Sequence, residues 1–261
     1  MELIIENCSS PGAHFSKNTN EVLLKIYGWI EDNNSPKLPF IEFRKRLEKE
    51  ANINDNNARN IYPLLKNGGL VEYHPGSELD SAQFFTRRGL AYLKALETKE
   101  MILQSDYTKV QKSEAASEVD KIMSSIVCDS LEKLLRNKEL NYSEGLKWYL
   151  MFLSKYGKIN KHEFALMVYI MNHDKDNWHQ ETEKIVHQYR NQEIELDVKV
   201  RVRNDQRIQE STGEKTRVED IAYFTAYSFY SGLINQAGLT RKSKDYFLVV
   251  EGEKINYLLE V

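Results

Sequence analysis

The sequence predicts a mainly α-helical protein with small β segments, arranged as two domains that a helical connector joins. Three observations lead to this prediction. The chain has 261 residues, of which 41% are hydrophobic, and this suits two domains of ordinary size. Apolar residues recur at helical spacing along most of the chain. In both halves, glycine follows a predicted helix and precedes a short apolar run. We place the domains at 1–100 and 142–261 and the connector at 101–141.

Charge and composition limit the possible functions. The formal net charge is -3, which argues against a protein that coats nucleic acid non-specifically, because that mode depends on many Lys and Arg side chains. No apolar run is long enough to cross a bilayer, and the first residues lack the pattern of a secretion signal. The two cysteines, Cys8 and Cys128, are typical of a reducing compartment. We therefore expect a cytoplasmic protein without a membrane partner.

The first domain is predicted to contain three helices after an irregular arm. Residues 1–17 show no helical period, so they form the arm. A polar cap precedes a helix that ends near Asp32, and a second helix covers 40–47. The third helix runs over 54–67, and its apolar stripe consists of Ala58, Ile61 and Leu65.

A short wing is predicted after the third helix. Gly68 and Gly69 stop this helix, and residues 70–73 read as a strand. A turn at 74–76 leads to a returning strand at 83–86, after which another helix opens at Arg87. Three helices followed by a two-stranded wing predict a winged helix.

The connector, residues 101–141, is polar with apolar residues at helical spacing. It is also compatible with a dimer-forming helix, which makes a homodimer possible. The apolar period does not extend over the three or four heptads that a coiled coil needs.

The second half repeats the same order more loosely. Helices are predicted at 144–157, 160–173 and 177–192, and residues 195–204 suit either a strand or a helix extension. Thr216 can cap a long helix over 217–236, and Gly238 stops it. Residues 239–250 then read as a hairpin with a basic turn, so we predict a second winged-helix-like domain and thus tandem winged helices.

The third helix of the first domain is the best candidate for reading DNA bases. Asn and Arg side chains match base edges in the major groove, Asn with adenine and Arg with guanine. Four such residues lie in the first two turns, where a recognition helix meets DNA: Asn56, Asn57, Arg59 and Asn60. They can also be ordinary capping and surface residues of an Asn-rich chain.

Other candidate DNA contacts are basic. A positive side chain on a helix or at a wing tip can bind the phosphate backbone without reading the sequence. These candidates are Arg44, Arg87, Arg88, Arg217, Arg241, Lys242 and Lys244.

The sequence contains no recognisable catalytic or metal centre. The histidines lack the paired spacing of a zinc-binding helix. The tripeptide Asp197-Val198-Lys199 fits half of a nuclease signature in which carboxylates hold Mg²⁺, and Asp174 or Asp176 would have to complete it. Between them lies a helix pattern where such nucleases have a strand hairpin. We therefore assign no catalytic residue, metal or cofactor.

The second half also carries a family likeness. Residues 147–175, a long helix some forty residues later, and 232–261 resemble the DNA-recognition region of type IIS restriction endonucleases of the AlwI and FokI kind. Residues 58–93 are similar to the winged-helix part of that region. The likeness covers 18–261 as a pattern, with Gly238-Leu239 as its Gly-Leu step. It implies double-stranded DNA as partner and a nuclease domain or subunit beside the recognition region, which this chain does not include.

These observations lead to one preferred function and two alternatives. The preferred function is a module that recognises a double-stranded DNA sequence in restriction or phage defence, without a nuclease centre of its own. The first alternative is a tandem winged-helix transcription regulator or replication initiator. The second is a scaffold subunit whose winged helices bind protein.

Overall fold

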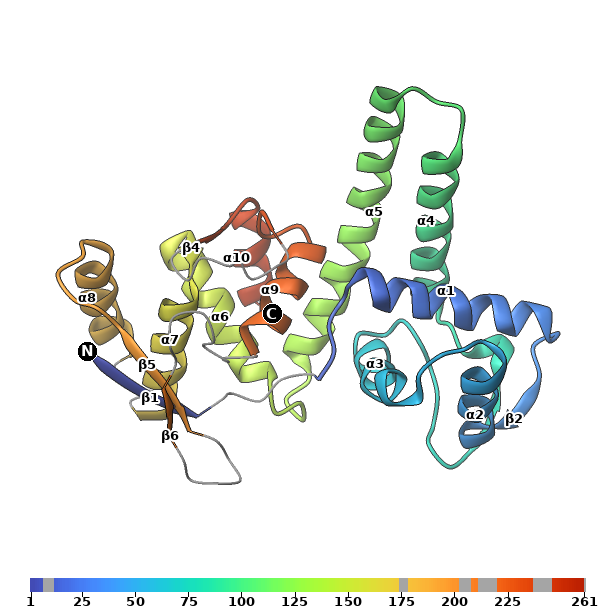
Figure 1. The fold of residues 1–261 in the computed structure, drawn as a ribbon, viewed down its shortest axis with the longest axis horizontal. Coiled ribbons are helices and arrows are strands. Elements are labelled where there is room, and N and C mark those ends of the chain that lie inside the picture. Colours follow the sequence, from blue (N-terminus) through green and yellow to red (C-terminus); the bar gives the residue numbers. More distant parts are fainter. Residues whose placement is uncertain (7–11, 174–177, 202–207, 211–219, 237–245, 261) are drawn as a thin grey trace. The chain divides into compact units, whose positions relative to one another are not determined.

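The computed structural model describes residues 1–6, 12–173, 178–201, 208–210, 220–236 and 246–260. Within these ranges the chain is mainly helical and has small two- and three-stranded sheets, so the predicted fold class is confirmed at this level (Figure 1). The chain forms two compact units. Unit 1 contains 1–10, 137–229 and 233–261, and unit 2 contains 11–136 and 230–232.

Unit 2 is built on five helices among its described residues. They are α1 (Lys17–Asp32), α2 (Phe40–Glu50), α3 (Asp55–Asn67), α4 (Arg87–Gln104) and α5 (Lys109–Arg136). The apolar faces of the first three helices meet in an aromatic core, where Phe43 lies 5.7 Å from Trp29 and 5.1 Å from Phe84 between ring centroids. The three helices predicted from apolar spacing in this domain are therefore present at about the predicted positions.

Unit 2 also contains two short antiparallel pairings of extended chain. Strand β2 (Lys37–Pro39) pairs antiparallel with β3 (Glu78–Asp80), and Val71 forms a single bridge with Phe85. The predicted pairing of 70–73 with 83–86 is therefore present in part, since the Glu72 N–H donates to the Phe84 carbonyl and the Thr86 N–H donates to the Leu70 carbonyl on either side of the bridge. Gln83 does not belong to this pairing. Residues Ser81–Gln83 form a 3-10 turn instead, because the Asp80 side chain accepts the Ala82 N–H and caps that turn.

The segment predicted as a connector lies mostly within a helical hairpin of unit 2. Helices α4 and α5 run side by side in Figure 1, joined by a turn at Ser105–Thr108. Residues of α5 at helical spacing are buried: Ala116, Val119, Met123, Val127, Leu131 and Leu134. Lys99 of α4 adds an ion pair to Asp120 at 2.6 Å. The apolar period of this segment therefore reflects packing within unit 2, against α4 and also beside α3.

Unit 1 has helices α6 (Ser143–Tyr156), α7 (Lys161–His173), α8 (Trp178–Arg190), α9 (Asp220–Tyr230) and α10 (Gly252–Glu260). Helix α7 packs on the N-terminal strand, and α10 packs on α6. The long helix predicted over 217–236 ends earlier than expected. The helix stops at Tyr230, Gly232 two residues later has φ +76°, and Ile234 then bridges Val249 as extended chain.

The first residues of the chain form a strand, which corrects the prediction made for them. The arm predicted as irregular begins with β1 (Glu2–Glu6), which pairs in parallel with β5 (Asp197–Arg201). Leu3 and Ile5 alternate into the core, since both are fully buried. Strand β6 (Ile208–Glu210) pairs antiparallel with β5, and β4 (Lys158–Ile159) pairs antiparallel with β7 (Phe247–Leu248). The ambiguous segment 195–204 therefore contains a strand.

No described helix is long and apolar enough to cross a membrane.

Candidate nucleic-acid interface

Helices α2 and α3 are joined by a tight turn of four residues. Asn52 in this turn has φ +51°, a left-handed conformation that Asn tolerates better than most residues. Ile53 is buried, and its N–H donates to the carbonyl oxygen of Leu47 at 3.3 Å. The turn is therefore anchored at its centre and fixes the direction in which α3 leaves α2.

Helix α3 has one buried and one exposed face. Ile61, Tyr62, Leu64 and Leu65 are at most 4% exposed and hold the helix in the core. Arg59, Asn60 and Pro63 are exposed, and Lys66 is half-buried. Among the described side chains of α3, residues 59–67, none is acidic. The outward face thus carries positive charge and amide groups.

A stripe of three residues follows this outward face, and we call Arg59, Pro63 and Lys66 the α3 stripe. Their spacing of four and three residues places them above one another over about 10 Å of helix. Pro63 lies inside the helix and has no N–H to donate to the carbonyl of Arg59. The proline therefore loosens the helical ladder at the first turns, where Arg59 lies.

Lys66 was not among the predicted contacts, although its spacing from Arg59 was visible in the sequence. Its Nζ lies 5.0 Å from the centre of the Tyr73 ring. The other contacts of that ring include Phe40, stacked at 4.3 Å with an interplanar angle of 11°. Lys66 is therefore held in place by a cation–π contact beside the base of the wing.

Arg44 of α2 lies in the same neighbourhood. It is half-buried, and burial raises the pKa of Tyr73 while the positive charge of Arg44 lowers it in part. Arg44 and Lys66 thus both add positive charge in the surroundings of Tyr73.

The wing of unit 2, residues 72–80, is acidic. It carries Glu72, Glu78 and Asp80, and its one basic group is His74, 3.8 Å from Glu72. Lys37 of β2 is the ion-pair partner of Asp80 at 3.4 Å. A segment of this charge repels phosphate, whereas the positive groups of α2 and α3 attract it.

The two arginines at the start of α4 have different surroundings. Arg87 is exposed and forms no ion pair within the described part of the chain. The Nη2 atom of Arg88 lies 3.4 Å from Asp129 of α5, and its Nη1 atom is buried. Arg88 is therefore engaged within the hairpin, whereas Arg87 faces solvent. A positive charge in the first turn of a helix interacts unfavourably with the helix dipole. The stability of α4 therefore does not require an arginine at position 87.

The remaining predicted contacts are placed less completely. Asn56 and Asn57 lie in the first turn of α3, but their side chains are outside the described residues. Asn60 lies beside Gly12, since a Cβ at position 12 would be 3.7 Å from its Oδ1 atom. Four others fall outside the described residues: Arg217, Arg241, Lys242 and Lys244.

Helix α9 of unit 1 precedes strand β7, as α3 precedes β3, but its described side chains do not include the outward-facing Arg, Lys and Asn residues that α3 carries. Its residues Ile221, Phe224, Thr225, Ala226, Tyr227 and Ser228 are all buried. From Ile221 to Tyr230, the described side chains of α9 include no Lys or Arg. Tyr227 of this helix is fully buried, and Tyr223 and Tyr230 are half-buried.

The half nuclease signature lies on strand β5 of unit 1, where Asp197 is exposed, Val198 is buried and Lys199 is half-buried. Lys199 pairs with Glu2 across the parallel strands β1 and β5, and lies 4.0 Å from Asp197. Asp174 and Asp176, which would have completed the signature, lie outside the described residues. Among the residues that the structure describes, no three His, Cys, Asp or Glu side chains cluster as a metal site.

Comparisons with protein-family models, curated proteins and solved structures found no match to this chain.

Proposed function

We propose that the protein binds double-stranded DNA in a sequence-specific manner through α3 of unit 2. The observation that carries this proposal is the outward face of α3, which combines Arg59, Asn60 and Lys66 on a helix whose other face is locked in the core. Arg and Asn can read base edges, and Lys66 can neutralise a phosphate.

The order of elements in unit 2 supports the proposal. Helix α1, strand β2, helices α2 and α3, and the paired segments after α3 follow each other as in a winged helix. In such modules the helix after the tight turn enters the major groove. Helix α3 occupies that position, and its turn is anchored by Ile53.

Unit 1 has a related order, with a different expected role. Helix α6, strand β4, helix α7, helix α9 and strand β7 follow one another with α8, β5 and β6 inserted. Because α9 is buried, we assign unit 1 no base-reading helix. Its proposed contribution is the basic run Arg241, Lys242 and Lys244, which would contact phosphates.

The experiment is selection of bound duplexes from a random-sequence DNA pool at about 50 mM salt, using the full chain. We expect an enriched sequence for the wild type. Arg59→Ala should relax the preference at one or two positions, at a cost of about 1–3 kcal/mol for the preferred base. Lys254→Ala, an exposed lysine on α10, is the matched control and should leave the preference unchanged.

A protein-binding scaffold is the second candidate, and the acidic wing favours it. Glu72, Glu78 and Asp80 lie where many winged helices contact DNA backbone. If no duplex in the pool binds with a salt-dependent affinity, the DNA proposal fails and the scaffold is preferred. A role in restriction or phage defence, with a nuclease partner, rests only on the resemblance of sequence patterns.

A further inference from the structure

Three helices of unit 2 meet at Gly69, directly after α3. The Gly69 N–H donates to the Lys66 carbonyl at 2.9 Å, and the Gly69 carbonyl accepts from the Thr86 hydroxyl at 2.8 Å. A Cβ at position 69 would overlap the Nζ atom of Lys133 and would lie 3.0 Å from its Cδ atom. The end of α3, the start of α4 and the last turn of α5 therefore adjoin one another here.

Each of these helices brings one basic residue to the junction. We call Lys66 of α3, Arg87 of α4 and Lys133 of α5 the junction cations. Lys66 is half-buried, and the other two are exposed. Within the ranges that the structure describes, none of the three forms an ion pair. The junction therefore carries positive charge that no acidic side chain neutralises directly.

The acids that lie closest to Lys133 along α5 have other partners. Asp129, one turn before Lys133, lies 3.4 Å from Arg88, and Glu132 lies 2.9 Å from Arg136. The Lys133 ammonium lies instead against the Gly69 turn, and the side chain is exposed to solvent. A positive charge in this setting attracts an anion.

We propose that Lys133 is a further DNA contact, which together with Lys66 and Arg87 binds the phosphate backbone of the duplex that α3 reads. This inference rests on the proposed function. The junction is continuous with the α3 stripe, since Lys66 belongs to both. Lysine suits the role because a point charge binds phosphate without selecting a base.

The length of α3 allows both kinds of contact at once. Gly69 lies about 15 Å beyond Arg59 along the helix, which exceeds the roughly 12 Å width of the major groove. The backbone that borders the groove can therefore reach the junction while Arg59 contacts a base edge.

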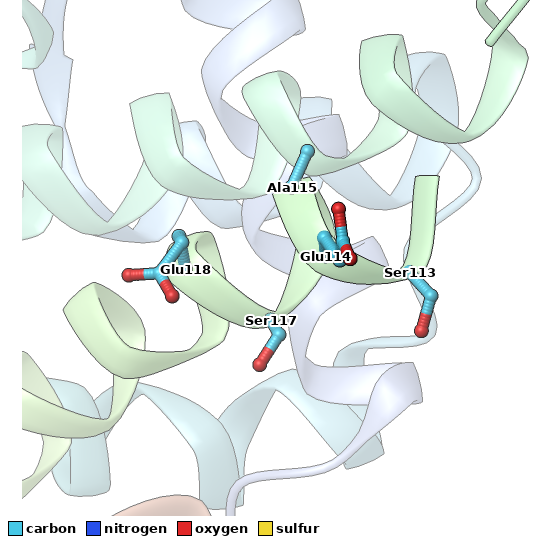
Figure 2. Close-up of a pocket in the computed structure, with 5 residues that line it drawn as sticks. All are labelled: Ser113, Glu114, Ala115, Ser117 and Glu118. Atoms are coloured by element: carbon cyan, nitrogen blue, oxygen red, sulfur yellow. The ribbon is translucent and has the colours of Figure 1, made fainter. Parts of the chain in front are cut away.

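The hollow on the N-terminal part of α5 does not offer a comparable site. Its lining residues are Ser113, Glu114, Ala115, Ser117 and Glu118 (Figure 2). Both charged side chains among them are glutamates, which repel phosphate. We therefore place the proposed contact at the opposite end of the helix, and a lysine near the hollow can serve as its control.

Binding titrations of the full chain with its selected duplex, at several salt concentrations, test the proposal. Lys133→Ala should weaken all duplexes alike, about fivefold, and lower the slope of log affinity against log salt by about one. Lys133→Arg keeps the charge and should keep both values. Lys109→Ala is the matched control, because Lys109 is exposed on the same helix about 36 Å away.

A second variant tests the contact between Lys133 and Gly69. Asn tolerates the Gly69 φ of +72° better than most residues, so Gly69→Asn keeps the end of α3 but puts a side chain where the Lys133 Nζ atom lies. It should weaken binding by itself and have no further effect when it is combined with Lys133→Ala. Both variants should keep the wild-type circular dichroism spectrum.

The outcomes separate this inference from the function on which it rests. If the wild type selects a sequence but Lys133→Ala binds with the wild-type affinity and slope, the proposed contact is wrong and the proposed function stands. The same holds if Lys109→Ala lowers the slope as much as Lys133→Ala does. If no duplex binds the wild type with a salt-dependent affinity, the proposed function fails, and the contact fails with it.

Discussion

Gly89 lies so close to Leu70 that a Cβ at position 89 would be 1.9 Å from the Leu70 carbonyl oxygen. The neighbouring Thr86 explains this approach. Its N–H donates to that same carbonyl at 3.1 Å, and its hydroxyl donates to the carbonyl of Gly69 at 2.8 Å. The Gly89 N–H donates to the Thr86 Oγ1 atom at 3.0 Å. The start of α4 is thus fastened to the chain directly after α3.

Gly89→Ala should therefore destabilise unit 2 severely, by about 3 kcal/mol or more, because backbone atoms must move. Gly28→Ala is the matched control, since a Cβ there meets nothing within 4 Å inside α1. It should raise the free energy of unfolding by up to about 1 kcal/mol. Urea unfolding followed by circular dichroism measures both, and equal small effects would contradict the assigned contact.

Pro63→Ala should stabilise the protein and weaken its DNA binding. The substitution restores the N–H that bonds to the Arg59 carbonyl, and we expect a gain of about 1–2 kcal/mol in the free energy of unfolding. A straighter α3 shifts Arg59 relative to Lys66, so affinity for the selected duplex should fall. Pro75→Ala in the exposed wing turn is the control and should not alter the affinity. Unchanged binding by Pro63→Ala would exclude a role for the proline in presenting Arg59.

The salt dependence of binding should identify the phosphate contacts. Lys66→Ala and Lys242→Ala should each weaken all duplexes alike and lower the slope of log affinity against log salt by about one. Binding titrations at several salt concentrations measure the slope. If Lys66→Ala instead changes base preference while leaving the slope intact, then Lys66 contacts a base edge.

Substitutions of Arg87 and Arg88 should distinguish an effect on DNA affinity from an effect on the free energy of unfolding. Arg87→Ala should reduce DNA affinity with little change in unfolding, because Arg87 is exposed. Arg88→Ala removes the partner of Asp129 and should cost about 1 kcal/mol of stability, because the pair is partly exposed. The same unfolding and binding measurements apply to both. Comparable losses of affinity without any loss of stability in Arg88→Ala would show that Arg88 also contacts DNA.

Glu163 of α7 should make the stability of unit 1 depend on pH. Its carboxylate is fully buried and accepts from Arg190 Nε at 2.6 Å. Burial raises its pKa above the ordinary value of 4.5, and Arg190 lowers it only in part. A group with a raised folded-state pKa favours folding below its unfolded pKa, and that contribution is lost as pH rises through the folded pKa.

The test compares the wild type with Glu163→Gln between pH 4 and pH 7 by urea unfolding. Glutamine cannot ionise, so the variant lacks this contribution. The free energy of unfolding of the wild type should therefore fall relative to that of the variant as pH rises above about 4.5. The opposite trend would mean that Arg190 outweighs the cost of burying the charge.

The helices were predictable because their signals are local. Phe40, Phe43 and Leu47 repeat at the period of a helix, and each of these positions is buried in α2. The stop at Gly68-Gly69 was equally local, since Gly69 adopts φ +72°. These features depend on residues within a few positions of each other, and they also located the face of α3 on which the proposed interface depends.

The tertiary structure decided what depends on distant partners. The sequence pattern of 1–17 could not show that Leu3 and Ile5 form a strand, because their partner strand begins at Asp197. The sequence pattern also could not show that Arg88 forms an ion pair with Asp129, or that most described residues of α9 are buried. Local periodicity determines which face of a helix is apolar. Only packing determines whether the other face reaches solvent, because burial is a property of neighbours that lie far apart in the chain.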